Sequence, residues 1–206
     1  NLGDKVIVTP LTFAASANCI RFRGGEVVFC DVEEDTYLMD IKKLSRLLSQ
    51  SPKGTYKGIV LVDFAGYPAN LEAFRQLADE YGLWIIEDAC HAPGGYFIDS
   101  KGEKQLCGNG NFADISVFSF HPVKHIATGE GGMATTNSKK LYEKLCLYRT
   151  HGITKDPALL CENHGGWYYE MQELGYNYRI TDFQAALGIS QLKRADMGLA
   201  RRQEIA

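Results

Sequence analysis

The chain has 206 residues, of which 45% are hydrophobic and 23% are charged, a composition typical of a soluble globular domain. A net charge of -3 argues against nucleic acid or an anionic membrane as partner, and no apolar run approaches the length of a membrane span. The six cysteines form no CxxC pair and no zinc-ligand spacing, which predicts free thiols in a reducing cytoplasm.

Short apolar runs alternate with helical patterns along the chain. We expect strands at residues 5–9, 27–29, 58–62, 83–86, 115–120 and 132–136. We expect helices at residues 13–22 and 40–48, after an Asn70 cap, and at 139–149. This alternation predicts an α/β fold with a mainly parallel sheet and helices on both faces.

Two segments stand outside this alternation. Residues 95–108 are polar and rich in glycine, which predicts a hairpin or a loop excursion, and residues 152–175 show no period and predict a long surface loop. Thr181 and Gln184 then form a capping box, followed by a long helix to about Glu204. We therefore expect a large-domain core at 1–150, and at 151–206 a loop and a helix leading toward a C-terminal domain beyond this sequence.

Two polar residues follow apolar strands, where open α/β sheets bind their ligands. Asp88 lies just beyond the apolar strand at 83–86, and Lys124 follows the strand at 115–120. Taken singly, Asp88 is as readily a helix cap or loop carboxylate, and Lys124 an ordinary solvated lysine. Together they suggest pyridoxal phosphate (PLP), which needs a lysine for its Schiff base and a carboxylate to keep the pyridine nitrogen protonated.

Other motifs fail on context. Residues 108–113 match GxGxxA, but they precede a strand instead of joining a strand to a helix. His121 and His125 have the i, i+4 spacing of zinc ligands, but Pro122 lies between them and there is no HExxH. The acidic strand end IIED at 85–88 is also found in ATPases, but the sequence lacks the GxxxxGK[ST] phosphate-binding loop that an ATPase needs. We expect no metal site.

The chain resembles the sugar-nucleotide aminotransferases of the DegT/DnrJ/EryC1/StrS family along nearly its whole length. The matching segments are VTPLTFAA at 8–15, IEDACH at 86–91, SFHPVK at 119–124, GEGG at 129–132, RTHG at 149–152 and GYNYRITDFQAALG at 175–188. The resemblance implies the PLP-dependent transferase fold of type I. Family members also carry an earlier phosphate-binding segment and a smaller C-terminal domain, to which nothing in this sequence corresponds.

The resemblance also implies roles for particular residues. Lys124 is expected to form the Schiff base and to move the proton between substrate and cofactor. Asp88 is expected to pair with the pyridine nitrogen, and His91 to touch the phenolic oxygen of the cofactor.

Three further positions match the family pattern. Phe13 is expected to stack on the pyridine ring, and Ser119 to donate to the phosphate. Asn177 is expected to reach the phosphate from a partner subunit, which implies a homodimer. Phe13 and Ser119 read equally as core or strand-end residues, and Asn177 as a turn residue.

Three segments look most like the transaminases of the pseudaminic acid pathway, namely VDFAG at 62–66, FSFH at 118–121 and WYYEMQ at 167–172. This implies transfer of an amino group, with glutamate as donor, to a UDP-linked 4-keto-6-deoxy sugar in surface polysaccharide or nonulosonic acid synthesis. The alternatives are a catalytically incomplete fragment and a PLP-binding regulatory module of the same fold.

Overall fold

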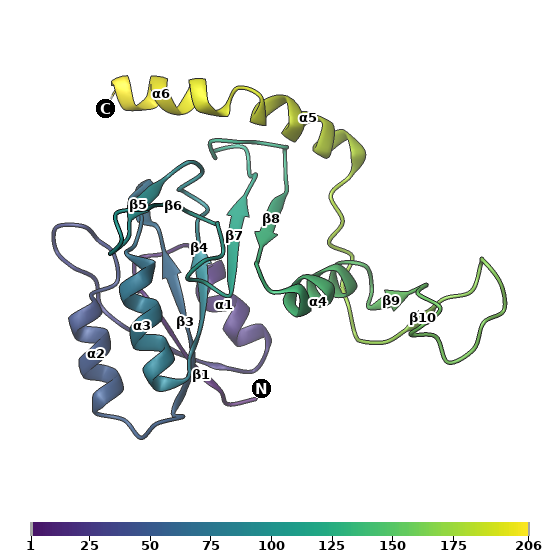
Figure 1. Cartoon of the computed structure of the whole chain (residues 1–206), viewed down its shortest axis with the longest axis horizontal. Helices are drawn as coiled ribbons and strands as arrows, with labels where there is room; N and C mark the ends of the chain where they lie inside the picture. Colours follow the sequence, from purple (N-terminus) through teal and green to yellow (C-terminus); the bar gives the residue numbers. More distant parts are fainter. Residues whose placement is uncertain (1, 206) are drawn as a thin grey trace.

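The computed structural model describes residues 2–205. Its centre is a six-stranded sheet with the order β2-β1-β3-β4-β7-β8 (Figure 1). The strands are β1 (Lys5–Val8), β2 (Glu26–Phe29), β3 (Tyr56–Val62), β4 (Trp84–Asp88), β7 (Ile115–Ser119) and β8 (Gly132–Thr135). All neighbours pair in parallel except β7 and β8, which are antiparallel. The predicted mainly parallel α/β fold is confirmed.

Helices cover both faces of the sheet because residues on each strand alternate between the faces. Ile7 packs in one core with Ile59, Ile85 and the helices α2 (Ile41–Ser49) and α3 (Leu71–Tyr81). Val6 and Val8 pack on the opposite face against Ile20 of α1 (Ala15–Phe22). The helix predicted to begin at residue 13 begins two residues later, at Ala15. In Figure 1, α2 and α3 lie side by side, and α1 lies behind the sheet.

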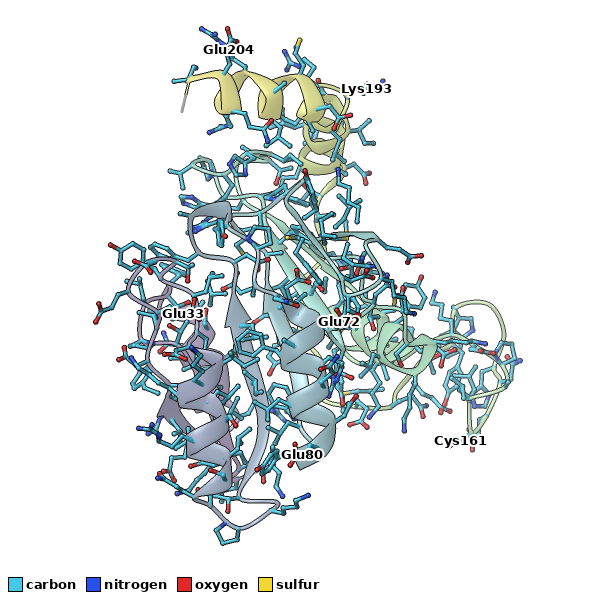
Figure 2. The ribbon with its side chains drawn as sticks, turned by 60° about the vertical axis from the view of Figure 1, so that its left-hand side comes forward. Glu33, Glu72, Glu80, Cys161, Lys193 and Glu204 are labelled. Atoms are coloured by element: carbon cyan, nitrogen blue, oxygen red, sulfur yellow. The ribbon has the colours of Figure 1, made fainter. Side chains whose placement is uncertain are left out.

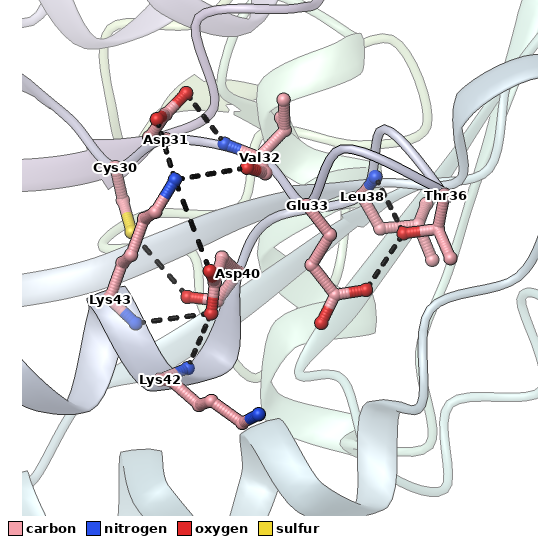
Figure 3. A network of polar contacts seen from close by, with 9 residues as sticks. All are labelled: Cys30, Asp31, Val32, Glu33, Thr36, Leu38, Asp40, Lys42 and Lys43. Atoms are coloured by element: carbon pink, nitrogen blue, oxygen red, sulfur yellow. Dashed lines mark hydrogen bonds and ion pairs between the residues drawn. The ribbon is translucent and has the colours of Figure 1, made fainter.

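Side-chain caps set where the helices begin. Asp40 precedes α2, and its carboxylate accepts hydrogen bonds from the backbone N–H groups of Lys42 and Lys43 (Figure 3). The Lys43 ammonium reaches back to Asp31 at 2.7 Å and to the Val32 carbonyl at 3.3 Å, which joins the end of the β2 segment to the helix. Asn70 caps α3 as predicted, and Gly82 ends α3 with a φ of 68°.

Replacing Asp40 by alanine is expected to lower the free energy of unfolding by about 1 kcal/mol, since two N–H groups at the helix start lose their acceptor. Chemical denaturation of the full-length protein measures this change, with Asp35→Ala as the control because Asp35 is an exposed carboxylate in the same connection. Equal destabilisation by both substitutions would show that the cap contributes nothing specific.

The segments outside the sheet differ in part from the sequence-based expectation. Residues 95–108 form the expected hairpin, from β5 (Tyr96–Ile98) and β6 (Lys104–Leu106). The predicted long loop contains a second small hairpin, of β9 (Ile153–Thr154) and β10 (Glu170–Met171). Figure 2 shows Cys161, in the loop between β9 and β10, far out from the sheet.

The predicted long C-terminal helix is two helices, α5 (Asp182–Leu192) and α6 (Ala195–Ile205). They separate where Arg194 donates to the Gln191 carbonyl three residues back, a 3₁₀-type bond at the end of α5. The Thr181 capping box is present as predicted. Figure 2 places Lys193 at this junction and Glu204 near the end of α6.

The helix α4 (Lys139–Arg149) completes the fold, together with a short 3₁₀ turn at Phe64–Gly66. Within residues 2–205, every helix is too short or too polar to span a lipid bilayer. The predicted division of the chain into parts 1–150 and 151–206 stays a prediction. Residues 1 and 206, at the outer ends of these parts, lie outside the described residues.

Candidate functional site

Parallel strands bring the predicted site residues to one edge of the sheet. Asp88 is the last residue of β4 and lies opposite Val62 of β3 and Val117 of β7. Ser119 is the last residue of β7, and Lys124 follows in the connection to β8. These positions lie at the carboxyl edge of the sheet, where open α/β folds bind ligands.

The Asp88 carboxylate is held from two sides. Its Oδ2 accepts a hydrogen bond of 3.0 Å from the Ser16 hydroxyl on α1, and its Oδ1 accepts one of 3.2 Å from the Cys90 N–H. Ser16 is buried, and its hydroxyl also lies 2.8 Å from that of Thr12. A helix that packs behind the strand therefore orients the carboxylate, although 72 residues separate Ser16 from Asp88.

A cavity of about 210 Å³ lies beside Asp88. Its lining is Ala65, Cys90, His91, Val123, Lys124 and His125. The predicted lysine and histidine thus share one cavity, although they come from different connections. Ala65 has a φ of 54°, an uncommon backbone conformation for a residue with a side chain, and so places a strained turn on the cavity wall.

The groups around this cavity influence one another electrostatically. Burial, with Asp88 as the next cause, raises the pKa of the Cys90 thiol to about 12, although the positive charge of Lys124 opposes this. Burial and then Lys124 lower the pKa of His91, against the opposing effect of Asp88. The thiol is therefore protonated and the imidazole neutral at neutral pH. Such an imidazole has one N–H to donate.

Backbone and side-chain hydrogen bonds fix the connection that carries Lys124. The Lys124 N–H donates to the His121 carbonyl at 2.9 Å, and the Thr128 N–H donates to the Phe120 carbonyl at 2.9 Å. The carbonyl of Glu130 accepts from the Thr128 hydroxyl and from the Gln184 amide of α5. The capping-box residue Gln184 therefore also ties α5 to this connection.

A glycine is required at one point of the same connection. Gly131 has a φ of 157°, and a Cβ there would approach the Thr128 hydroxyl oxygen to 2.5 Å. Gly131 thus allows the connection to turn back into β8.

Of the six predicted residues, only His91 and Lys124 line the cavity, and Asp88 lies beside it through its hydrogen bond to Cys90; the other three lie outside the lining. Phe13 lies just before α1 with 76% of its surface exposed. The Ser119 hydroxyl accepts from the His121 N–H at 3.3 Å. Asn177 is exposed and pairs through its backbone with Thr150 of its own chain. Their predicted cofactor contacts stay predictions.

Sequence reasoning missed Ser16 and Ala65. A serine in the first turn of a helix carries no signal of its contact with Asp88, because that contact depends on how α1 packs. Ala65 carries no polar group, so only its backbone conformation identifies it.

A second, larger hollow of about 920 Å³ lies between the helices α5 and α6 and the strands β7 and β8. Phe118, Phe120 and Met133 line one wall, and Leu192 and Leu199 the other. It contains none of the predicted site residues. His125 borders both spaces, and burial followed by the charge of Arg202 lowers its pKa.

The smaller cavity has the groups that PLP chemistry needs. A primary amine and a neutral imidazole line it, and a carboxylate held by two donors lies beside it. A fixed carboxylate suits a protonated ring nitrogen, and the amine suits an aldehyde. The residues present therefore fit the reacting end of this cofactor, while Ser119 is the one predicted phosphate contact from the same subunit.

Comparison with known proteins gives consistent matches over the chain. The profile of the DegT/DnrJ/EryC1/StrS aminotransferase family matches residues 1–206. A UDP-4-amino-4,6-dideoxy-N-acetyl-beta-L-altrosamine transaminase of Campylobacter jejuni is 42% identical over 97% of this chain and 49% of its own length. A GDP-perosamine synthase of Escherichia coli O157:H7 is 35% identical over 99% of this chain and 50% of its own length.

Solved structures agree with these matches. PseC of Helicobacter pylori, an aminotransferase of pseudaminic acid biosynthesis, has 34% identity and a TM-score of 0.78 over 94% of this chain and 47% of its own. A sugar aminotransferase of Streptococcus pneumoniae, solved in its PLP form, has 29% identity and a TM-score of 0.81 over all of this chain and 52% of its own. The chain thus spans about half the length of the curated relatives it matches.

Proposed function

The chain belongs to the DegT/DnrJ/EryC1/StrS aminotransferase family, and from this premise we propose that it supplies the PLP-binding core of an aminotransferase for nucleotide-linked keto sugars. The predicted family and the type I fold are confirmed. The observation that carries the proposal is one cavity at the carboxyl edge of the sheet that His91 and Lys124 line, with Asp88 bonded to the Cys90 N–H on its wall.

When bound, the cofactor supplies an electron sink for the carbon that gains or loses the amino group. Lys124 would hold the cofactor covalently and carry the proton to and from the reacting carbon. Asp88, oriented by Ser16, would hold the proton on the ring nitrogen. His91, neutral because of burial and of Lys124, would donate a hydrogen bond to the phenolic oxygen.

A homodimer would complete this site. In the described chain, Asn177 lies on the segment between β10 and α5, and no residue of that segment lines the cavity with Lys124. We propose that Asn177 reaches the phosphate of the other subunit, while Ser119 donates from its own. Phe13 is exposed, so its side chain is free to stack on the pyridine ring of a bound cofactor.

The proposed substrate is a UDP-linked 4-keto-6-deoxy-N-acetylhexosamine, aminated at C4 with glutamate as donor, in the cytoplasmic synthesis of a surface polysaccharide or nonulosonic acid. The 42% identity with the Campylobacter jejuni transaminase supports this choice. The GDP-perosamine synthase, at 35%, is the competing comparison.

A paired assay tests the proposal with the full-length protein, PLP and glutamate. We expect 2-oxoglutarate to form with the UDP-linked 4-keto sugar and much more slowly with a GDP-linked 4-keto sugar. A preference for the GDP sugar would overturn the substrate but keep the aminotransferase. PLP binding without amino transfer to either sugar would favour a binding module instead.

A further inference from the structure

Two acidic side chains are buried directly behind the proposed site. Asp63 follows β3, Glu87 is the residue before Asp88 in β4, and each has 1% of its surface exposed. Because side chains alternate along a strand, Glu87 points to the opposite face of the sheet from Asp88. The Cys107 thiol, after β6, joins the two acids, and single donor atoms of all three lie within 4.8 Å of one another.

The hydrogen-bond donors at this cluster are unevenly shared. Glu87 accepts from the Gly108 N–H at 3.0–3.1 Å and from the Ser116 hydroxyl. Asp63 accepts from the Ala69 N–H at 2.9 Å through Oδ1, whereas its buried Oδ2 makes no hydrogen bond of regular geometry and has the weakly donating Cys107 thiol nearby. Neither acid takes part in an ion pair among residues 2–205. Two ionised carboxylates in this position would repel each other at low dielectric, with one oxygen unsatisfied.

We infer that Asp63 carries a proton on Oδ2 and donates it to Glu87, so that the two acids form one hydrogen-bonded pair with a single negative charge. This explains why Oδ2 makes no regular hydrogen bond as an acceptor, since a protonated carboxyl group is itself a donor. The proton belongs on Asp63 because Glu87 already has two donors that favour its charged form.

The electrostatic environment agrees with this assignment. Burial, followed by the charge of Glu87, raises the pKa of Asp63 to about 8. Burial also raises the pKa of Glu87, while Ser116 and Gly108 oppose the increase, and the neighbouring Asp88 adds to it. Burial and both acids raise the pKa of the Cys107 thiol, which is therefore neutral.

The pair has a consequence for Asp88, and this part rests on the proposed function. The backbone N–H of Asp63 donates to the Asp88 carbonyl at 3.1 Å, and Glu87 accepts from Gly108, in the connection after β6, and from Ser116 of β7. The pair thus joins the ends of β3 and β4 to β7 at the point where Asp88 leaves the sheet. Asp63 and Glu87 are positioning residues for Asp88.

Difference infrared spectroscopy of the cofactor-free, full-length protein tests the shared proton. At about pH 6 we expect the carbonyl stretch of one protonated carboxyl group, lost in Asp63→Asn and kept in the control Asp35→Asn. Asparagine has nearly the same shape as aspartic acid and still offers an N–H to Glu87. If Asp63→Asn fails to fold, the wild-type band alone is tested, and it should disappear as the pH rises through about 8. Absence of the band at pH 6 overturns the inference.

Stability gives a second measurement. The pKa of the folded Asp63 carboxyl is about 8, so it keeps its proton up to that pH, whereas the unfolded residue loses it near the ordinary pKa of 3.8. The stability from this group is therefore fully present below about pH 4 and is lost as the pH rises toward 8. Relative to Asp63→Asn, the unfolding equilibrium constant of the wild type should rise by about tenfold per pH unit across this window.

A flat difference between wild type and Asp63→Asn contradicts the inference. So does a stoichiometric metal ion in the purified protein that Asp63→Asn releases, because a cation would then occupy the place of the proton. Neither measurement uses aminotransferase activity, so a failed proton assignment is distinguishable from a failed function.

Discussion

Replacing Lys124 by alanine is expected to lower the aminotransferase rate by roughly 10³-fold or more, because the variant loses both the amine that holds the cofactor and the group that moves the proton. The visible absorbance of the bound cofactor should shift to that of free PLP, and borohydride should no longer attach the cofactor to the peptide around residue 124. Steady-state kinetics and peptide mapping measure the two effects separately.

The variant Lys124→Arg separates the reactive amine of Lys124 from its positive charge, and Lys144→Ala serves as the control. Lys124→Arg keeps a positive charge at the cavity but offers no nucleophilic amine at neutral pH, so it should be as inactive as the alanine variant. Lys144→Ala, on the exposed face of α4, should behave as wild type. Small primary amines added to Lys124→Ala should restore part of the proton transfer. Normal activity of Lys124→Arg would exclude a covalent role for Lys124.

Replacing Asp88 by asparagine is expected to lower kcat/KM by on the order of 10²- to 10³-fold, since asparagine fills the same space but cannot stabilise a protonated ring nitrogen. Ser16→Ala removes one of the two hydrogen bonds to this carboxylate and leaves the charge. Its effect should be roughly tenfold. A much larger loss of kcat/KM in Asp88→Asn than in Ser16→Ala would show that the charge of Asp88 matters more than its exact placement.

The same substitution has a readout that needs no substrate. Asp88 is the second cause, after burial, of the raised pKa of the Cys90 thiol. Asp88→Asn should therefore lower that pKa and increase the alkylation rate of Cys90 at about pH 9, measured by peptide mapping of the cofactor-free protein. Unchanged alkylation would show that the carboxylate does not act on the cavity in the way the structure indicates.

The order of the main sheet elements, and the position of Asp88 and Lys124 after apolar strands, followed from local patterns. The apolar runs that become β1, β3 and β4 predict buried strands because such strands need apolar side chains on both faces. Asn70 and Thr181 mark helix starts because a side-chain oxygen must satisfy free N–H groups there. Asp88 and Lys124 stood out because each follows an apolar strand, and family resemblance supplied their roles.

Contacts between distant segments were decided by the tertiary structure alone. The antiparallel pairing of β8 depends on the tight connection that Gly131 allows and Gln184 holds. The break between α5 and α6 leaves no local signal, because no proline or glycine lies at residues 193–194.

The environment of the site depends on folding in the same way. Ser16 meets Asp88 across 72 residues, and Asp63 meets Glu87 because β3 and β4 are neighbours in the sheet. A sequence pattern records which side chains are available and on which face of a strand they lie. It does not record which charges become buried together, and burial is what moves a proton onto Asp63 and keeps His91 neutral.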